Sequence, residues 1–381
     1  MWSSPTDPTE PMTPFPPDPT PTAPPAPEAR SADQFPSPHR SGGRGEVGAG
    51  PGHPPRKWPY ILVFLLLAGL IPETIATNST SVLKIVSSPL SLIFVALFYG
   101  TADIVIREAI IRRPLGLAGK VLLGVAFGFM NEGVVAGTWY TVKPDGYAYI
   151  AGIDFSWAVS LAVFHLLISV LLPIYLFDSV APALVGVPLL KRRGIIFMTV
   201  VFLALCALGL FAPIARPQRL VVYLAALLLV AIALQLPPAP PRVPMREPPP
   251  GLWSLRALGF LAMLLYFVAI YLLPVIWLRL IPPPLFVWLP GLLANSALLG
   301  LVAIALLWGV GWSRRRDWSP RYALALISGA LSFSVLFSFI PPLLATWEPL
   351  ATVPFAAFLI ILTLRARHAS PLMEIPLPSA V

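Results

Sequence analysis

From Tyr60 onward the chain is a succession of apolar segments, each about as long as a helix that crosses a membrane. A helix needs about 20 apolar residues to cross a hydrocarbon core of about 30 Å. Only 11% of the 381 residues are charged, whereas soluble domains carry about 25%. The sequence therefore predicts an all-α, polytopic transmembrane helix bundle of about ten spans, at residues 60–77, 89–111, 119–138, 157–177, 194–213, 219–236, 255–280, 286–309, 321–344 and 347–365.

The distribution of lysine and arginine predicts the orientation of these spans. If the N-terminus is cytoplasmic, twenty of these residues fall in inside segments and five in outside loops. Cytoplasmic loops of membrane proteins carry the excess of positive charge. We therefore expect both termini to be cytoplasmic in a multi-pass protein of the cell membrane. The basic residues lie beside apolar runs, so the expected partner is the lipid bilayer and no nucleic acid.

Proline-rich stretches divide the chain. Residues 1–57 hold sixteen prolines and no apolar core, which predicts a disordered cytoplasmic tail. Residues 237–251 form a second Pro-rich stretch, expected to be an extended cytoplasmic linker. The linker separates a six-helix half, 58–236, from a four-helix half, 252–367, and a short tail, 368–381, follows. Pro72 and Glu73 interrupt the first span, so whether it crosses fully is left open.

Charged residues within the predicted spans concentrate in the first four. The second span contains YGTADIVIREAIIRR, at residues 99–113. Asp103 precedes Arg107 by four residues, and Glu108 precedes Arg112 by four, which is the favourable order for intrahelical ion pairs. The sequence therefore predicts both pairs, with Arg112 reaching toward the membrane surface. A catalytic or transport role for the same charges is the alternative.

The third and fourth spans each carry a polar residue near the membrane centre. Gly124, Gly128 and Glu132 recur every four residues, so they predict a close helix contact into which Glu132 points. His165 and Pro173 lie on the fourth span, and Pro173 predicts a local opening of that helix.

A count of residues along the two spans places Glu132 and His165 at similar depths. Glu132 lies about 20 Å from one face and His165 about 12 Å from the other, in a core of about 30 Å. The sequence therefore predicts a Glu132–His165 pair, with Glu73 approaching from the outer end of the first span. Glu132 is interpreted as a proton acceptor or base, and a purely structural hydrogen bond is the alternative.

Residues 60–182 resemble a family of uncharacterised bacterial multi-pass membrane proteins. That family shows an IRE..RR helix, then a G.A.G..EEG helix, then an H..(W/I)SI..PI segment, and the corresponding stretches here are IREAIIRR, GVAFGFMNEG and HLLISVLLPI. Asn131 stands where the family pattern has the first of two glutamates. The resemblance implies a topology and a set of positions, and no activity.

The order of the same motifs is weakly similar to that of CAAX-type intramembrane proteases, whose motifs are EExxxR, FxxxH and HxxxN. The corresponding positions are Arg107-Glu108-xxx-Arg112, Phe127-xxx-Asn131 and His165-xxx-Ser169. The resemblance implies that Glu108 is the base, His165 orients water and Ser169 donates to the oxyanion. Arg107, Asn131 and Ser169 replace the Glu, His and Asn of the family, which implies a divergent or inactive relative.

Three functions follow from these residues. The first is a glutamate–histidine hydrolase or its inactive descendant, so the question of enzyme activity is left open. The second is a proton-coupled small-solute permease or channel that uses Glu132, His165 and Asp103. The third is a non-catalytic membrane scaffold, and a membrane-protein partner or a homo-oligomer is compatible with each. No cofactor or metal site is expected, because one histidine with two glutamates is an unusual zinc ligand set. The candidate catalytic residues are Glu132, His165, Glu108, Asn131 and Ser169.

Overall fold

The described part of the chain is helical apart from its connections and one short hairpin. The computed structural model describes residues 57–76, 87–141, 149–212, 216–239, 250–273, 276, 288–313, 320–338, 357 and 361. Within these residues, seven helices are long and apolar enough to cross a membrane, and two shorter apolar helices cover Trp58–Glu73 and Arg321–Phe333. The predicted N-terminal tail except Lys57, and the tenth span except residues 357 and 361, lie outside the described residues.

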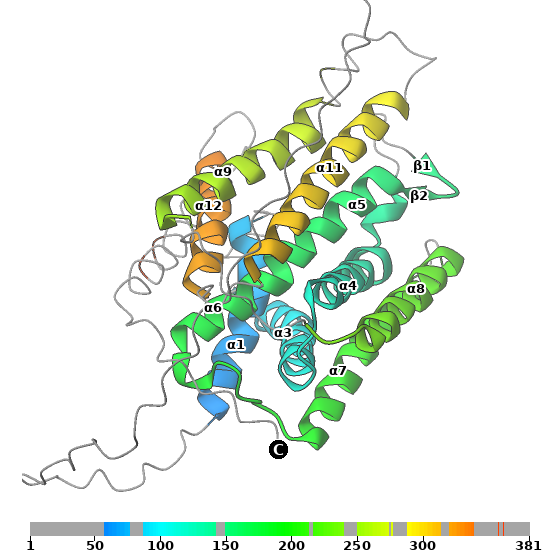
Figure 1. Ribbon diagram of the computed structural model, residues 1–381. Coiled ribbons are helices and arrows are strands. Elements are labelled where there is room, and N and C mark those ends of the chain that lie inside the picture. Colours follow the sequence, from blue (N-terminus) through cyan, green and yellow to red (C-terminus); the bar gives the residue numbers. More distant parts are fainter. Residues whose placement is uncertain are drawn as a thin grey trace, which may run out of the picture. The chain divides into compact units, whose positions relative to one another are not determined.

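Figure 1 shows the arrangement of the elements. They are α1 (Trp58–Leu70), η1 (Ile71–Ala76), α3 (Pro89–Arg112), α4 (Leu117–Gly128), η2 (Phe129–Ala136), η3 (Thr138–Tyr140), β1 (Tyr149–Ile150), β2 (Ile153–Asp154), α5 (Phe155–Phe164), η4 (His165–Leu171), α6 (Leu172–Val180), η5 (Pro182–Leu184), α7 (Arg192–Leu210), α8 (Arg216–Gln235), α9 (Leu252–Phe267), η6 (Val268–Leu272), α11 (Trp288–Ser313) and α12 (Pro320–Ser338). β1 and β2 pair antiparallel.

Four of the long helices contain a π-helical segment, in which the backbone bonds five residues back instead of four. η1, η2, η4 and η6 continue α1, α4, α5 and α9 respectively. In η4 the N–H of Leu172 bonds to the carbonyl of Leu167. The π-helical segment ends at Leu171, two residues before Pro173, which has no N–H to continue the ladder. The opening predicted from Pro173 is thus a π-helical turn on its N-terminal side.

Standard signals begin and end the helices near the polar residues. Pro89 opens α3, and the preceding Ser88 caps it by accepting a hydrogen bond from the Ser91 amide at 3.4 Å. Asp154 caps α5 by accepting from the Trp157 amide at 2.9 Å. η2 ends at Gly137, whose φ of +71° is a left-handed conformation that favours glycine.

Glycines allow the helices of the first half to approach closely. A Cβ on Gly100 of α3 would lie 2.6 Å from the Cα of Leu65 on α1. A Cβ on Gly128 of α4 would lie 3.0 Å from the Cα of Ala162 on α5. These distances leave no room for a larger side chain, so the two helix pairs pack backbone to backbone. α4 also contacts α8, which lies beside it in Figure 1.

The predicted second half packs partly on the first. α9 and α12 contact each other closely at Gly259 and Gly329, where an added Cβ would meet the partner backbone. A buried apolar cluster then joins α12 to residues of the first half, and it consists of Ile71, Phe164, Ile168, Leu172, Leu176, Leu324 and Leu331. The division of the chain at 237–251 stays a prediction, because residues 240–249 lie outside the described residues.

α7 and α8 expose apolar side chains along much of their length. Their exposed residues include Ile196, Phe197, Val200, Leu208, Val221, Leu224 and Leu228. Soluble monomers rarely expose contiguous apolar surface of this extent, whereas lipid tails solvate it. These side chains are therefore the ones expected to face the bilayer.

Candidate functional site

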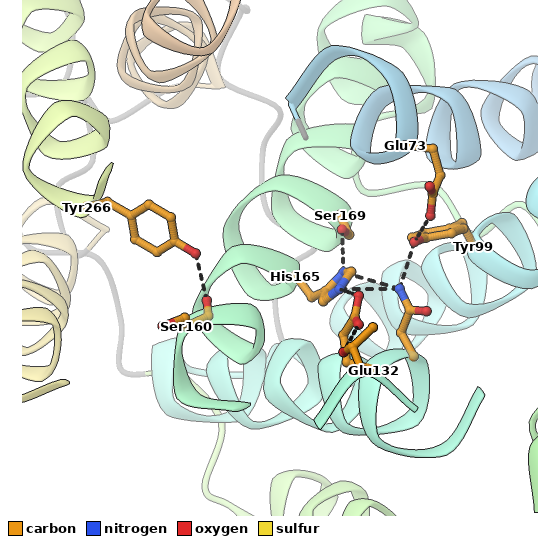
Figure 2. Close-up of polar contacts among 9 residues, drawn as sticks. Glu73, Tyr99, Glu132, Ser160, His165, Ser169 and Tyr266 are labelled. Atoms are coloured by element: carbon orange, nitrogen blue, oxygen red, sulfur yellow. Dashed lines mark hydrogen bonds and ion pairs between the residues drawn. The ribbon is translucent and has the colours of Figure 1, made fainter. Parts of the chain in front are cut away.

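A hydrogen-bonded cluster of polar side chains lies where η1, α3, η2 and η4 meet. At its centre the Nε2 atom of His165 lies 2.9 Å from Oε1 of Glu132. The other ring nitrogen, Nδ1, lies 2.7 Å from the Ser169 hydroxyl. Figure 2 shows that the imidazole sits between these two groups. Both ring nitrogens therefore have a hydrogen-bonding partner.

The cluster continues from His165 to Glu73 through an amide and a phenol. Asn131 approaches the imidazole with its Nδ2 atom, 3.3 Å from Nε2 and 3.5 Å from Nδ1. The same Nδ2 donates to the Tyr99 hydroxyl at 2.7 Å. The Tyr99 hydroxyl donates in turn to Oε1 of Glu73 (Figure 2). Glu73, Tyr99, Asn131, His165, Glu132 and Ser169 are called the polar network below.

The helices bring these residues together because small residues let α4 approach α5 and η4 closely. A Cβ on Gly124 would lie 3.0 Å from the Cα of Leu166, and one on Gly128 would lie 3.3 Å from the Cβ of His165. The glycine row predicted to place Glu132 in a helix contact thus lies against the helix that carries His165. Glu73, Glu132 and His165 all belong to π-helical segments, which are frequent at functional sites.

The end of η2 is held by groups outside the network. Thr138 donates its hydroxyl to Oε2 of Glu132, so both carboxylate oxygens are bonded. Arg219 of α8 donates to the backbone carbonyls of Val134, Val135 and Gly209. A cation at the C-terminal end of a helix stabilises carbonyls that have no intrahelical partner. Arg219 therefore fixes the segment that carries Glu132.

Tyr140 provides a further contact at the same end of η2. Its hydroxyl donates to the carbonyl of Gly133 at 2.6 Å. Burial raises the pKa of Tyr140 to about 12, although the Arg219 guanidinium acts in the opposite direction. The phenol therefore keeps its proton at neutral pH and remains a donor.

His165 can gain a proton without losing a hydrogen bond. In the neutral ring, Nε2–H donates to Glu132, and Nδ1 accepts from the Ser169 hydroxyl. In the charged ring, Nδ1–H donates to Ser169, whose oxygen then accepts. A hydroxyl can exchange these roles by rotation, so the surroundings of His165 accommodate both protonation states.

Arg107 has a different partner from the one predicted. Its Nε and Nη2 atoms bond to Oδ1 of Asp178, at 3.0 and 2.8 Å. The intrahelical Asp103–Arg107 pair is therefore wrong. The Asp178 carboxylate accepts two charge-assisted hydrogen bonds from the planar guanidinium of Arg107. Two such bonds are stronger than the single contact expected between Asp103 and Arg107 along one helix. Asp103 is completely buried, and neither of its carboxylate oxygens has a hydrogen-bond partner within the described structure.

Glu108 lies in a second group of charges, away from the polar network. It forms the predicted pair with Arg112, at 2.9 Å. Its other oxygen accepts from the backbone amides of Leu189 and Leu190. The role implied for Glu108, that of a base acting with His165, has no contact to support it. Glu108 instead holds the connection between α6 and α7.

The α6–α7 connection, residues 181–191, is also bound by three basic side chains. Lys57 donates to the carbonyl of Pro188 at 2.7 Å. Arg107 donates to the carbonyls of Leu184 and Val187, and Arg112 donates to that of Leu190. The IREAIIRR motif therefore anchors a connection of the backbone.

Four of the five predicted site residues come together. They are Glu132, His165, Asn131 and Ser169, and Glu108 is the exception. No sequence pattern predicted the contacts that Asp178, Thr138 and Arg219 make. Thr138 lies six residues after Glu132, just beyond the end of the helix. That position was the one sequence signal that Thr138 could reach the Glu132 carboxylate. Among the described residues, no group of three or more His, Cys, Asp or Glu side chains is placed to hold a metal ion.

The apolar helices and the lipid-facing surface define a multi-pass helical membrane protein. The model of an uncharacterized membrane protein family matches residues 61–374. The chain belongs to this family. The match covers the polar network and both predicted halves. No curated protein and no solved structure matches the chain.

Proposed function

We propose that the protein carries protons through its helix bundle, as a proton-coupled permease or a channel, and that the Glu132–His165 pair is its proton-binding element. The observation that carries this proposal is the bonding of His165, whose two ring nitrogens contact a carboxylate and a hydroxyl. That arrangement accepts and releases a proton while the bonds to Glu132 and Ser169 are kept.

The path from His165 to Glu73 supports the proposal. Glu73, Tyr99, Asn131 and His165 form consecutive contacts that join two ionisable side chains through a phenol and an amide. Ionisable groups inside membrane segments characteristically mark ion or proton pathways. With the orientation predicted from the basic residues, Glu73 lies toward the outer face, where it would exchange protons with water.

The experiment measures proton uptake by liposomes that contain the purified full-length protein. A potassium gradient with valinomycin sets the membrane potential, and an enclosed pH-sensitive dye reports the internal pH. Uptake should exceed that of protein-free liposomes. It should fall by about tenfold or more in Glu132→Gln and in His165→Ala, because each substitution removes a proton acceptor.

Matched variants control for damage to the fold. Tyr99→Phe breaks the path between Asn131 and Glu73 and should slow uptake. Tyr266→Phe also removes one partly buried phenol bond, to the carbonyl of Ser160 at 2.9 Å, and should leave uptake unchanged (Figure 2). Wild-type uptake no faster than that of empty liposomes would contradict proton conduction. If all four variants take up protons as fast as wild type, the polar network has no part in proton conduction.

An intramembrane hydrolase is the second candidate function. The observation that favours it is the contact of a carboxylate, an imidazole and a hydroxyl in Glu132, His165 and Ser169. In such a site Glu132 and His165 would act as acid and base toward a water molecule. Glu132 would then be the base, which is the role that the resemblance to the proteases implies for Glu108. Ser169→Ala would abolish hydrolysis that depends on the hydroxyl, whereas Ser160→Ala on the same helix would not.

A purely structural scaffold is the least supported function. It requires that the buried polar groups satisfy one another. Within the described structure, both oxygens of Asp103 and Nε1 of Trp139 are buried without a hydrogen-bond partner. Each such group costs free energy in the folded state, so a role in function accounts for it better.

A further inference from the structure

Asp103 is the most unusual ionisable residue in the described part of the chain. It has no exposed surface, and neither carboxylate oxygen has a hydrogen-bond partner there. A charged carboxylate without a partner is too costly to bury, so such a group takes up a proton and becomes neutral. Burial without a partner therefore favours the neutral acid form of Asp103 over the carboxylate.

The charged groups on the helices that neighbour α3 form no hydrogen bond with Asp103 in the described structure. α3 packs against α1, α4, α6, α7 and η4. On these elements Asp178 pairs with Arg107, and His165 bonds to Glu132 and Ser169. Lys57, which precedes α1, bonds to Pro188. The remaining charged residues of these elements are Lys120, Arg192 and Arg193, which lie at the beginnings of α4 and α7. None of these groups has a hydrogen bond to Asp103 in the described residues.

The position of Asp103 on α3 lies between two groups of bonded polar residues. Tyr99, Asp103 and Arg107 are four residues apart, so they lie on one face of the helix at intervals of about 6 Å. Tyr99 belongs to the polar network, and Arg107 bonds to Asp178. Asp103 is therefore the one carboxyl group on this face between the network and the Arg107–Asp178 pair.

We propose that Asp103 is a second proton-binding site, which continues the proton path from the polar network toward the Arg107–Asp178 end of α3. This inference rests on the proposed function. A water molecule between turns of the helix would carry the proton to the carboxylate and later from the acid. Each transfer leaves the donor with one proton fewer and the acceptor with one more, and no bond to carbon changes.

The first part of the test determines whether Asp103 holds a proton. Infrared spectra of the reconstituted full-length protein at neutral pH are compared between wild type and Asp103→Asn. A carbonyl stretch of a protonated carboxylic acid should be present in wild type and absent from Asp103→Asn. The same band should persist in Glu132→Gln. Identical acid bands in wild type and Asp103→Asn would overturn the proposal, because Asp103 would then be ionised.

The second part measures liposome proton uptake in the same samples. Asp103→Asn should slow uptake by about tenfold or more, and Asp103→Glu should restore part of it, because proton transfer needs a titratable group at this position. Thr101→Val is the matched control. Thr101 is also on α3 and fully buried, and its hydroxyl donates to the carbonyl of Leu97 on the same helix. This variant should conduct like wild type.

The possible results separate the two proposals. If Glu132→Gln stops uptake and Asp103→Asn conducts like wild type, the second site is overturned and the proposed function stands. If wild type itself does not conduct, the proposed function fails and the path through Asp103 fails with it. In that case the infrared comparison still decides whether Asp103 holds a proton. Elution of each variant as a single peak in size-exclusion chromatography shows that it is folded.

Discussion

Arg107 and Asp103 show how the partner of a charged residue determines its role. Arg107 is 1% exposed, and its guanidinium is bonded to Asp178 and to two backbone carbonyls. Its Cζ atom also lies 5.0 Å from the centre of the Phe177 ring, within the range of a cation–π contact. Asp103, one turn away, has none of these contacts within the described structure. The bonds of Arg107 hold it within the fold, whereas Asp103 is the residue that we propose as a proton-binding site.

The structural role of Arg107 can be tested with a double substitution. Arg107→Met should destabilise the protein by about 3–5 kcal/mol, because the largely buried Asp178 then loses its charged partner. The double variant, Arg107→Met with Asp178→Met, should recover most of that loss, because no unpaired charge remains. Unfolding in detergent measures both changes. Equal stability of the single and double variants would contradict a coupled pair.

The helices show how the polar network is assembled. Glu73, Asn131, Glu132, His165 and Ser169 all lie in π-helical segments. A π-helical turn contains an additional residue, so it rotates the side chains that follow it relative to a regular helix. Hydrophobic periodicity predicts a helix but does not show where such a turn occurs. Pro173 was the single sequence signal for one of them.

The close approach of α4 to α5 and η4 is a testable requirement of this arrangement. Gly128→Leu should destabilise the protein by about 1–3 kcal/mol, because the added side chain meets the backbone of Ala162. It should also slow proton uptake by separating η2 from η4. Gly300→Leu is the control, since a Cβ there meets no atom within 4 Å. Thermal unfolding and uptake are measured for both. A Gly128 variant as stable and active as the Gly300 variant would show that the contact is not needed.

At the scale of the whole molecule, the order of the apolar segments and the basic loops predicts the topology. The structure shows seven helices of spanning length and two shorter apolar helices among the described residues. Ten spans, with both termini in the cytoplasm, remain a prediction. The orientation matters for function because it decides which face supplies protons to Glu73.

Cysteine labelling in intact cells tests this topology. Cys206 is the single cysteine and is buried, so a Cys206→Ala protein provides the background. A membrane-impermeant maleimide should label Lys143→Cys from outside, and it should label Lys191→Cys and Ser379→Cys only after the membrane is opened. External labelling of Ser379→Cys, with Lys191→Cys labelled only from inside, would indicate an odd number of spans between these two residues. Reversed labelling at Lys143 and Lys191 would indicate the opposite orientation.

The sequence alone predicted the helical membrane fold correctly, for a physical reason. Segment length and charge are local properties, so a membrane helix is recognised without knowing its neighbours. The row of Gly124, Gly128 and Glu132 also lies within one helix, and a count of residues placed His165 at a matching depth. These features needed no knowledge of contacts between distant parts of the chain.

Only the tertiary structure decided the partners of the charged residues. Glu108 binds the backbone amides of Leu189 and Leu190, more than eighty residues away. A backbone amide has the same chemistry at nearly every position, so no residue type in the sequence marks it as a partner. Arg107 likewise bonds to Asp178 and not to Asp103, which is nearer in the sequence. The packing of the helices places the Asp178 carboxylate against its guanidinium. Local spacing determines which charges can meet along a helix, whereas the packing of helices determines which of them do.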